Sequence, residues 1–283
     1  MNRISIFSLL LIFLAQFSMA ATPVAPKSVP TNDQVYVQNE VIFTSSFDHS
    51  EQSYVELAPP KQKNKNKQEY VDVLIALHGH GADRWQYIND KRNECRATRD
   101  MAKKYGMILI SPDYRKRTSW MGPAAEADML QIIHDLKKKY KVRHVFLSGA
   151  SMGGSSTLIF AALHPNLLSG IMSSNGTANM LKYENFQKAI KASYGGDKIT
   201  ATEEYTKRSP ELMPKKFTMP MAVTLGGKDT SVPPDSARRL VKNLQKLGKK
   251  DILLFDREKM GHSTSYDDTV AAFEFIFKRA GVK

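Results

Sequence analysis

The sequence predicts an α/β fold with a mostly parallel sheet that helices cover on both faces. Three observations lead to this prediction. Apolar runs alternate with amphipathic segments from about residue 70 to the C-terminus. The apolar runs are continuous rather than alternating, as expected for strands that are buried on both faces. No internal repeat breaks the series, and about 263 residues beyond an N-terminal leader are enough for one large core.

The first 20 residues have the features of a secretory signal peptide. Arg3 supplies a positive charge, an apolar run covers residues 4–13, and small residues stand at Ser18 and Ala20. The apolar run is shorter than the roughly 20 residues that span a bilayer, which argues against a membrane anchor. We therefore expect cleavage after Ala20, giving an exported protein that is secreted or periplasmic.

The mature chain is expected to contain one catalytic domain and no transmembrane segment. Residues 21–32 are rich in proline and lack periodicity, which is typical of a flexible leader. The domain would then cover residues 33–283. Its single cysteine, Cys95, excludes an internal disulfide and is expected to pack as a small apolar residue on a helix.

The charge of the chain says little about its partners. The net charge is +13, and losing Arg3 with the signal peptide would lower it to +12. A basic surface attracts acidic polysaccharide, anionic lipid or nucleic acid without specificity. The densest basic cluster, residues 61–67 (KQKNKNK), lacks the interleaved aromatic side chains of a nucleic-acid groove. We predict that it is a solvated loop, and no specific nucleic-acid partner is expected.

The strands and helices can be predicted in order along the chain. Residues 35–43 and 52–60 alternate in polarity, which indicates two antiparallel edge strands. Further strands are predicted at residues 70–81, where the strand runs into a Gly-rich loop, and at 106–114, 142–150, 167–176, 220–229 and 250–258. Helices are predicted at residues 92–105, 126–140, 153–165, 233–248 and 266–280.

Residues 177–216 form the one irregular insertion in this series. The segment carries Tyr183, Phe186, Tyr194 and Tyr205 and has mixed polarity. It is long enough to cover a pocket, so we interpret it as a short lid.

The motif Gly149-Ala150-Ser151-Met152-Gly153 identifies the candidate nucleophile. It matches G-x-S-x-G and lies between a predicted strand and a predicted helix, where a tight turn pushes the serine side chain out above the sheet. The glycines relieve crowding in this turn, and the helix N-terminus favours developing negative charge. The alternative is a turn of small residues without a catalytic role.

A base and an acid are predicted from the order in which they follow the serine. His262 lies in a loop between the last strand and the last helix, and Asp229 comes just after the apolar run MAVTLGG at residues 221–227. This gives the chain order Ser…Asp…His. Four other histidines (His49, His134, His144 and His164) have ordinary structural positions, and three other acids (Asp235, Asp251 and Asp256) fall in a helix start or a strand.

The loop LHGHGAD (residues 77–83) is the predicted site for an oxyanion. The backbone amide of His80 is the first choice as donor, Gly81 the next, and the amide of Met152 supplies the second donor. A rival interpretation takes His78-x-His80 with Asp83 as metal ligands. However, the aspartate stands one position too late for the usual metallohydrolase pattern, so we expect no metal and no cofactor.

The ordered set LHGHG, GASMGG, GGKDTSVP and GHS resembles the α/β-hydrolase superfamily. Within it, the pattern is similar to exported feruloyl and acetylxylan esterases and to the dienelactone-hydrolase and prolyl-oligopeptidase-like group. The resemblance extends from about Val71 to the C-terminus and implies Ser151 as nucleophile, Asp229 as acid and His262 as base. In that group the loop before the helix at 126–140 borders the acyl pocket, so Trp120 is either a pocket wall that binds substrate or a core aromatic.

The expected function is that of a serine esterase acting through an acyl-enzyme. The substrates would be short or aromatic acyl esters, small or attached to polysaccharide; carbohydrate is implied by export and resemblance only. A prolyl peptidase normally has a large N-terminal propeller, for which about 50 residues before Val71 are too few. The alternatives are an acyltransferase or serine peptidase of the same fold, or a non-catalytic envelope or polysaccharide-binding protein. The sequence predicts no oligomeric state.

Overall fold

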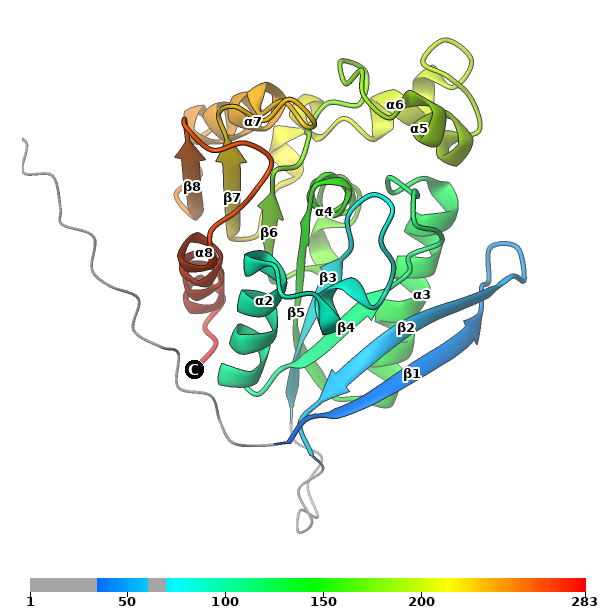
Figure 1. The fold of residues 1–283 in the computed structure, drawn as a ribbon, viewed down its shortest axis with the longest axis vertical. Helices are drawn as coiled ribbons and strands as arrows, with labels where there is room; N and C mark the ends of the chain where they lie inside the picture. Colours follow the sequence, from blue (N-terminus) through cyan, green and yellow to red (C-terminus); the bar gives the residue numbers. More distant parts are fainter. Residues whose placement is uncertain (1–34, 61–69) are drawn as a thin grey trace, which may run out of the picture.

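The computed structural model describes residues 35–60 and 70–283 (Figure 1). The predicted signal peptide, the leader at 21–32 and the basic segment at 61–67 lie outside the described residues. Within the described part of the chain, no helix is both long enough and apolar enough to span a bilayer.

One sheet organises the described chain. Its eight strands follow the spatial order β1-β2-β4-β3-β5-β6-β7-β8, with antiparallel pairing of β1 with β2 and β2 with β4 and parallel pairing elsewhere. The strands are β1 (Val37–Thr44), β2 (Glu51–Ala58), β3 (Val71–Leu77), β4 (Ile108–Pro112), β5 (Val142–Ala150), β6 (Gly170–Ser174), β7 (Met221–Gly226) and β8 (Ile252–Arg257). The predicted α/β-hydrolase fold, with its mostly parallel sheet, is confirmed.

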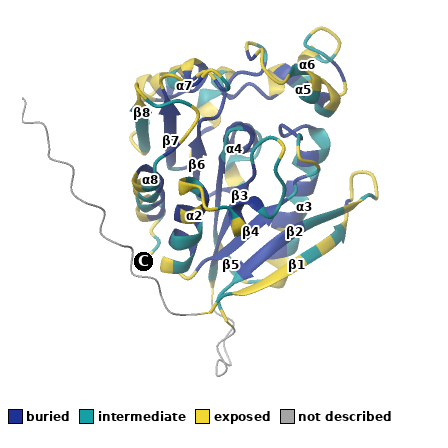
Figure 2. Ribbon diagram, viewed as in Figure 1, coloured by how far each residue is buried: buried dark blue, intermediate teal, exposed yellow. Residues whose placement is uncertain are grey.

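One prediction about the N-terminal strands is wrong. Both were expected at the edge of the sheet, but only β1 is an edge strand, because β2 pairs with β1 on one side and β4 on the other. The central residues of β2 are buried, whereas β1 is largely exposed (Figure 2). Alternation of polarity predicted the two strands, but it did not predict that β4 pairs with β2.

Helices cover the two faces of the sheet. One apolar cluster joins β3 residues Val73, Ile75 and Leu77 to helices α3 (Pro123–Lys139), α4 (Met152–Leu163) and α7 (Asp235–Lys246). The second cluster joins Leu74 and Ala76 to α1 (Gln86–Asn89), α2 (Asn93–Lys104) and α8 (Tyr266–Arg279). Successive β3 residues thus face opposite layers, which is why this strand is continuously apolar.

The predicted lid segment, residues 177–216, contains two short helices. These are α5 (Gln187–Tyr194) and α6 (Thr202–Lys207), followed by 3-10 turns at Pro210–Leu212 and Pro214–Lys216. Figure 1 shows α5 and α6 above the edge of the sheet at which the parallel strands end. We keep the name lid segment for residues 177–216.

A buried ionic contact fastens the lid segment to α3. Arg208 follows α6 and has a fully buried side chain, whose Nη2 lies 2.7 Å from Oε2 of Glu126 on α3. His164, at the end of α4, places Nε2 2.8 Å from the other oxygen of Glu126. Burial opposes ionisation of Glu126, but the hydrogen bond to His164 and the charge of Arg208 outweigh it and lower its pKa to about 2.

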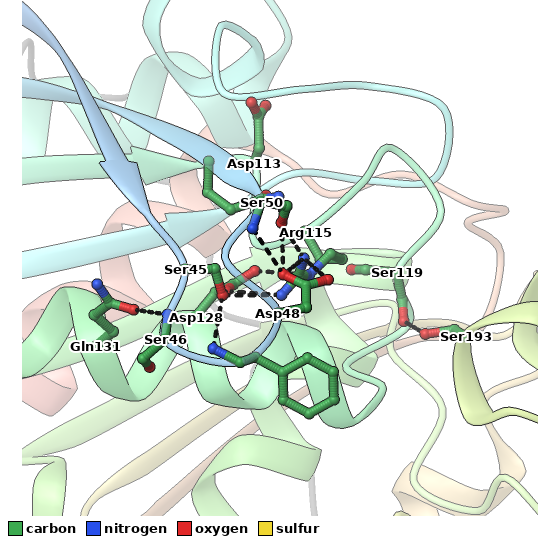
Figure 3. A network of polar contacts seen from close by, with 12 residues as sticks. Ser45, Ser46, Asp48, Ser50, Asp113, Arg115, Ser119, Asp128, Gln131 and Ser193 are labelled. Atoms are coloured by element: carbon green, nitrogen blue, oxygen red, sulfur yellow. Dashed lines mark hydrogen bonds and ion pairs between the residues drawn. The ribbon is translucent and has the colours of Figure 1, made fainter.

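A second polar network fastens the β1–β2 turn to α3 (Figure 3). Arg115 lies between Asp128 of α3 and Asp48 of the turn, with its Nη1 2.9 Å from Oδ2 of Asp48. Its Nε lies 3.0 Å from Oδ2 of Asp128, an ion-pair distance without hydrogen-bond geometry. Ser45 donates a hydrogen bond of 2.6 Å to Oδ1 of Asp128. These contacts fix the loop after β4, which carries Arg115, to the β1–β2 turn and to α3.

Cys95 is fully buried on α2, as predicted. Burial raises the pKa of its thiol to about 12, which keeps the sulfur protonated and apolar at neutral pH.

Candidate active site

Ser151 stands at a strained turn between β5 and α4. Its φ of 60° and ψ of −119° fall outside the regions that residues with a side chain normally adopt. The turn needs glycine on both sides: a Cβ at Gly153 would lie 2.0 Å from the carbonyl oxygen of Leu77, and one at Gly149 would lie 2.5 Å from the Gly153 carbonyl group. The predicted strand–turn–helix setting of the G-x-S-x-G motif is therefore present.

A chain of hydrogen bonds connects the three residues that the sequence singled out. His262 places Nε2 2.8 Å from Oγ of Ser151 and Nδ1 2.6 Å from Oδ2 of Asp229. The Asp229 side chain is 1% exposed and that of His262 is 32% exposed. With its proton on Nδ1, the imidazole donates to the carboxylate and offers Nε2 as an acceptor for the serine proton.

Backbone amides hold the Asp229 carboxylate in this orientation. Its Oδ1 accepts hydrogen bonds from the amides of Ser231 (3.0 Å) and Val232 (2.9 Å), which leaves Oδ2 for His262. β7 ends at Gly226, so Asp229 lies in a loop at the same edge of the sheet as Ser151. The loop residue thus has a partner for each carboxylate oxygen.

The weaker candidates lie elsewhere. Asp256 pairs with Arg238, Asp235 with the same arginine, and Asp251 with Arg279. The four histidines given structural positions stay there: His49 in the β1–β2 turn, His134 exposed on α3, His144 on β5 and His164 at the end of α4.

The loop after β3 lies next to Ser151 and contains a backbone amide without an acceptor. An ideal Cβ on Gly79 would lie 3.8 Å from Cβ of Ser151, so the loop after β3 directly adjoins the serine. The Gly79 amide donates to Oε1 of Gln86 (2.8 Å) and the Gly81 amide to the carbonyl of Arg117 (2.8 Å). Among the described residues, the amides of His80 and Met152 have no acceptor. The geometry therefore favours His80 over Gly81 as a donor, and Met152 begins α4 where amides are free.

The histidine rings of this loop are occupied with protein contacts. His78 is fully buried, with Nδ1 2.9 Å from the Gly79 carbonyl oxygen and Nε2 3.2 Å from the Asp113 carbonyl oxygen. Burial lowers the pKa of His78, which favours a neutral ring. A neutral ring has one N–H group and donates it to one of these two carbonyls. Nδ1 of His80 accepts from the indole of Trp120 at 3.0 Å. No cluster of three or more metal-ligating side chains occurs within residues 35–60 and 70–283.

Trp120 lies behind the site rather than on its surface. Its side chain is fully buried and packs against the rings of His80, Tyr183 and Phe186, with centroids 5.4–5.9 Å away. In this conformation Trp120 offers no exposed surface to a substrate. The substrate-binding prediction for Trp120 therefore has no direct geometric support, and the core-aromatic alternative fits better.

Two residues near the site were missed by sequence reasoning. Gln86, on the short helix α1, holds the Gly79 amide, and no motif marks it. Phe186 has a ring that is partly exposed and lies 4.5 Å from that of His80. Its left-handed φ of 56° is unusual for a bulky residue. The sequence placed Phe186 in the lid segment but carried no signal for this contact.

The lid segment borders the loop that carries Asp229. The hydroxyl of Tyr183 donates to the carbonyl of Ser231 (2.8 Å), and the Asn185 amide donates to the same carbonyl (2.9 Å). A cleft of about 450 Å³ lies between the lid segment and this loop, with Asn179, Tyr183 and Thr230 among its lining residues, but Ser151, His262 and Asp229 do not line it. Its volume is in the range of small-molecule sites.

Solved structures with the same fold include small serine hydrolases and peptidases. The S-formylglutathione hydrolase of Staphylococcus aureus has a TM-score of 0.67 at 15% identity, over 88% of this chain and 100% of its own. A fluorophosphonate-binding serine hydrolase of the same organism has a TM-score of 0.65 at 16% identity, over 87% and 99%. The acylaminoacyl peptidase of Pyrococcus horikoshii has a TM-score of 0.66 at 17% identity, over 88% of this chain but only 42% of the peptidase.

The sequence comparisons give the family. No curated protein matches the chain. The family match, however, covers residues 120–278, which is more than half of the chain and includes all three residues of the hydrogen-bonded chain. By this match, the chain belongs to the prolyl oligopeptidase family.

Proposed function

We propose that this protein is a serine carboxylic-ester hydrolase in which Ser151 is the nucleophile, His262 the base and Asp229 the acid. The observation that carries the proposal is the continuous hydrogen-bonded chain from Asp229 through His262 to the Ser151 hydroxyl. A serine hydroxyl is a weak nucleophile until a neighbouring base accepts its proton, and this geometry supplies that base.

The proposed reaction has two halves. Nε2 of His262 takes the Ser151 proton while Oγ attacks the ester carbonyl, and the oxyanion of the tetrahedral intermediate accepts hydrogen bonds from the amides of His80 and Met152. The intermediate collapses, the bond to the alcohol breaks, and His262 protonates the departing oxygen. Water, deprotonated by His262, then attacks the acyl-enzyme and releases the carboxylic acid and the free serine.

Two considerations favour small or aromatic esters over long lipids. The lid segment is short and of mixed polarity, and the ring of Phe186 is partly exposed next to the His80 loop. An exposed aromatic ring next to the loop of the proposed oxyanion donor suits an aromatic acyl group or a sugar ring. The N-terminal sequence resembles a secretory signal peptide. For this reason the proposal includes esters that are carried on a polysaccharide outside the cytoplasm.

A peptidase is the second candidate, because the matching family is that of prolyl oligopeptidase. The chain spans nearly the whole length of the two Staphylococcus aureus hydrolases but less than half of the Pyrococcus horikoshii peptidase. A fold shared by both activities does not choose between them, so the substrate must be tested directly.

The test is hydrolysis of p-nitrophenyl acetate by the chain from residue 21 onward, beside its Ser151→Ala variant. We expect the wild type to release p-nitrophenol and the variant to retain at most about 10⁻³ of its kcat, since the nucleophile is lost. Ser46→Ala, an exposed serine in the β1–β2 turn, is the matched control and should match the wild type. A wild type no faster than Ser151→Ala on esters contradicts the proposal, and faster cleavage of aminoacyl p-nitroanilides than of acetyl or feruloyl esters would favour the peptidase.

A further inference from the structure

Trp120 makes one directed contact with the loop that bears the proposed oxyanion donor. Its indole N–H donates a hydrogen bond of 3.0 Å to Nδ1 of His80. The Trp120 side chain is fully buried. Water therefore cannot replace the bond without opening the structure, and a buried indole N–H left without an acceptor is unfavourable.

The chemistry of the indole fixes the state of the His80 ring. An indole nitrogen donates and never accepts, so Nδ1 of His80 must be the acceptor. The imidazole is then neutral and carries its proton on Nε2. Burial lowers the pKa of His80, which favours the same neutral form. The ring of Phe186, 4.5 Å away, packs against the imidazole and limits its rotation.

The peptide backbone around His80 is held on both sides. The amide before it, at Gly79, is bound by Gln86, and the amide after it, at Gly81, is bound by the carbonyl of Arg117, each at 2.8 Å. Between these two anchors the His80 amide has no acceptor among the described residues. Its direction therefore depends on the two anchors and on the side chain of the same residue, which Trp120 holds.

The lid segment in turn holds Trp120. The hydroxyl of Tyr194 on α5 donates to the Trp120 carbonyl at 3.0 Å, and that of Ser193 donates to the carbonyl of Ser119. Trp120 and Met121 both have left-handed φ values, 45° and 53°. Bulky residues adopt such values only where surrounding contacts impose them. Helix α5 supplies those contacts.

We propose that Trp120 is a positioning residue of the oxyanion hole, whose indole N–H orients His80 so that the His80 amide points at the ester oxygen. Helix α5 of the lid segment keeps the indole in place. The inference rests on the proposed function, because the direction of this amide affects a reaction only if an acyl group is bound to Ser151.

The decisive variant is Trp120→Phe, which keeps an aromatic ring in the core and removes the N–H. An oxyanion donor acts mainly in the transition state, so its misalignment lowers kcat and spares KM. We expect kcat for p-nitrophenyl acetate to fall about tenfold, while KM stays within about twofold of the wild-type value. This fall in kcat is smaller than the one that follows removal of an entire oxyanion donor. Affinity for a trifluoromethyl ketone, which forms a tetrahedral adduct on serine, should fall by about the same factor. Trp85→Phe, at the other tryptophan of the chain, should leave kcat within about twofold.

Variants of His80 separate positioning from general stability. His80→Asn keeps an oxygen acceptor close to the position of Nδ1, whereas His80→Ala removes it. We expect His80→Asn to retain kcat within about threefold and His80→Ala to lose about tenfold. Adding Trp120→Phe to His80→Ala should then cost little more, since the bond is already absent. This comparison stays informative even if Trp120→Phe alone folds poorly.

Three results would overturn the inference: a Trp120→Phe enzyme with kcat within twofold of wild type, a change confined to KM, or fully additive losses in the double variant.

Nitrogen-15 NMR of the imidazoles gives a readout without catalysis. It should show the proton of His80 on Nε2 in the wild type and a mixture of tautomers in Trp120→Phe. A wild type that is inactive on all esters but shows this tautomer would refute the proposed function, whereas an active wild type without it would refute the role of Trp120.

Discussion

Two buried aspartates of this molecule hold cationic or basic partners in opposite ways. Asp229 contacts an imidazole that is one-third exposed and can gain or lose a proton, while two backbone amides bind its other oxygen. Asp128 contacts Arg115, a guanidinium that is always charged and mostly buried. The first arrangement can transfer a proton at the edge of the sheet. The second can only hold the β1–β2 turn and the loop after β4 against α3.

Burial opposes the negative charge of Asp128. Burial raises the pKa of Asp128, against the lowering by Ser45 and Arg115, so the ionised carboxylate is only partly compensated. Such pairs contribute little net stability, yet removing one partner leaves an unpaired buried charge. The comparison teaches that burial of an acid marks a candidate site only when its partner can change charge and is accessible to substrate.

Asp229→Asn should give the largest effect and should act on activity alone. The amide oxygen can still accept from Ser231 and Val232, but the side-chain NH₂ would face Nδ1 of His262 and favour the wrong tautomer. We expect kcat for p-nitrophenyl acetate to fall about 10⁴-fold with little change in melting temperature. Steady-state kinetics with thermal unfolding measure this, and an Asn variant with more than a tenth of the wild-type kcat would show that Asp229 does not orient the base.

Arg115→Ala should lower stability and largely spare activity, the opposite of Asp229→Asn. It leaves Asp128 buried without its guanidinium, so we expect the free energy of unfolding to fall by about 3–5 kcal/mol while kcat per folded molecule changes far less than in Asp229→Asn. Urea denaturation gives the first value and active-site titration with a fluorophosphonate corrects the second for the folded fraction.

The double variant Arg115→Met/Asp128→Leu sharpens the same comparison. With both charges replaced by apolar groups, most of the lost stability should return. Losses that simply add would mean that Arg115 and Asp128 stabilise the fold through other contacts.

Glu126 should give the smallest effect, a shift in the pH dependence of stability. Its pKa is lowered to about 2 in the folded protein, below the ordinary value of 4.5. A carboxyl with a lowered folded pKa contributes stability above its ordinary value, and this is lost as the pH falls from about 4.5 toward 2. The melting temperature of the wild type should therefore decline over this range more steeply than that of Glu126→Gln. Parallel curves would mean that the lid anchor does not depend on this charge.

Sequence patterns predicted the parts of the molecule that local chemistry determines. β5 was predicted with the same bounds as the structure has, since β-branched and apolar residues lead directly into the glycines of the turn. The pairing of Ser151, His262 and Asp229 was predicted because loops after parallel strands meet at one edge of a sheet.

Other features depend on contacts between distant segments and left no local pattern. Helices α5 and α6 are short and were predicted only as an irregular insertion, because tertiary contacts such as that of Arg208 with Glu126 stabilise them. The indole bond from Trp120 to His80 joins residues 40 positions apart, and the positive φ of Trp120 is imposed by its surroundings. Neither composition nor periodicity records such a contact.

The position of His262 after the last strand has a consequence for the order in which the protein becomes reactive during synthesis. The nucleophile turn forms between β5 and α4, but the histidine follows β8, the strand that closes the far edge of the sheet by pairing with β7. Ribosomes release the N-terminal part of a chain first. A nascent chain that ends before residue 250 contains Ser151 and Asp229 but lacks His262, so the proposed hydrolysis can begin only after the final segment has emerged and docked.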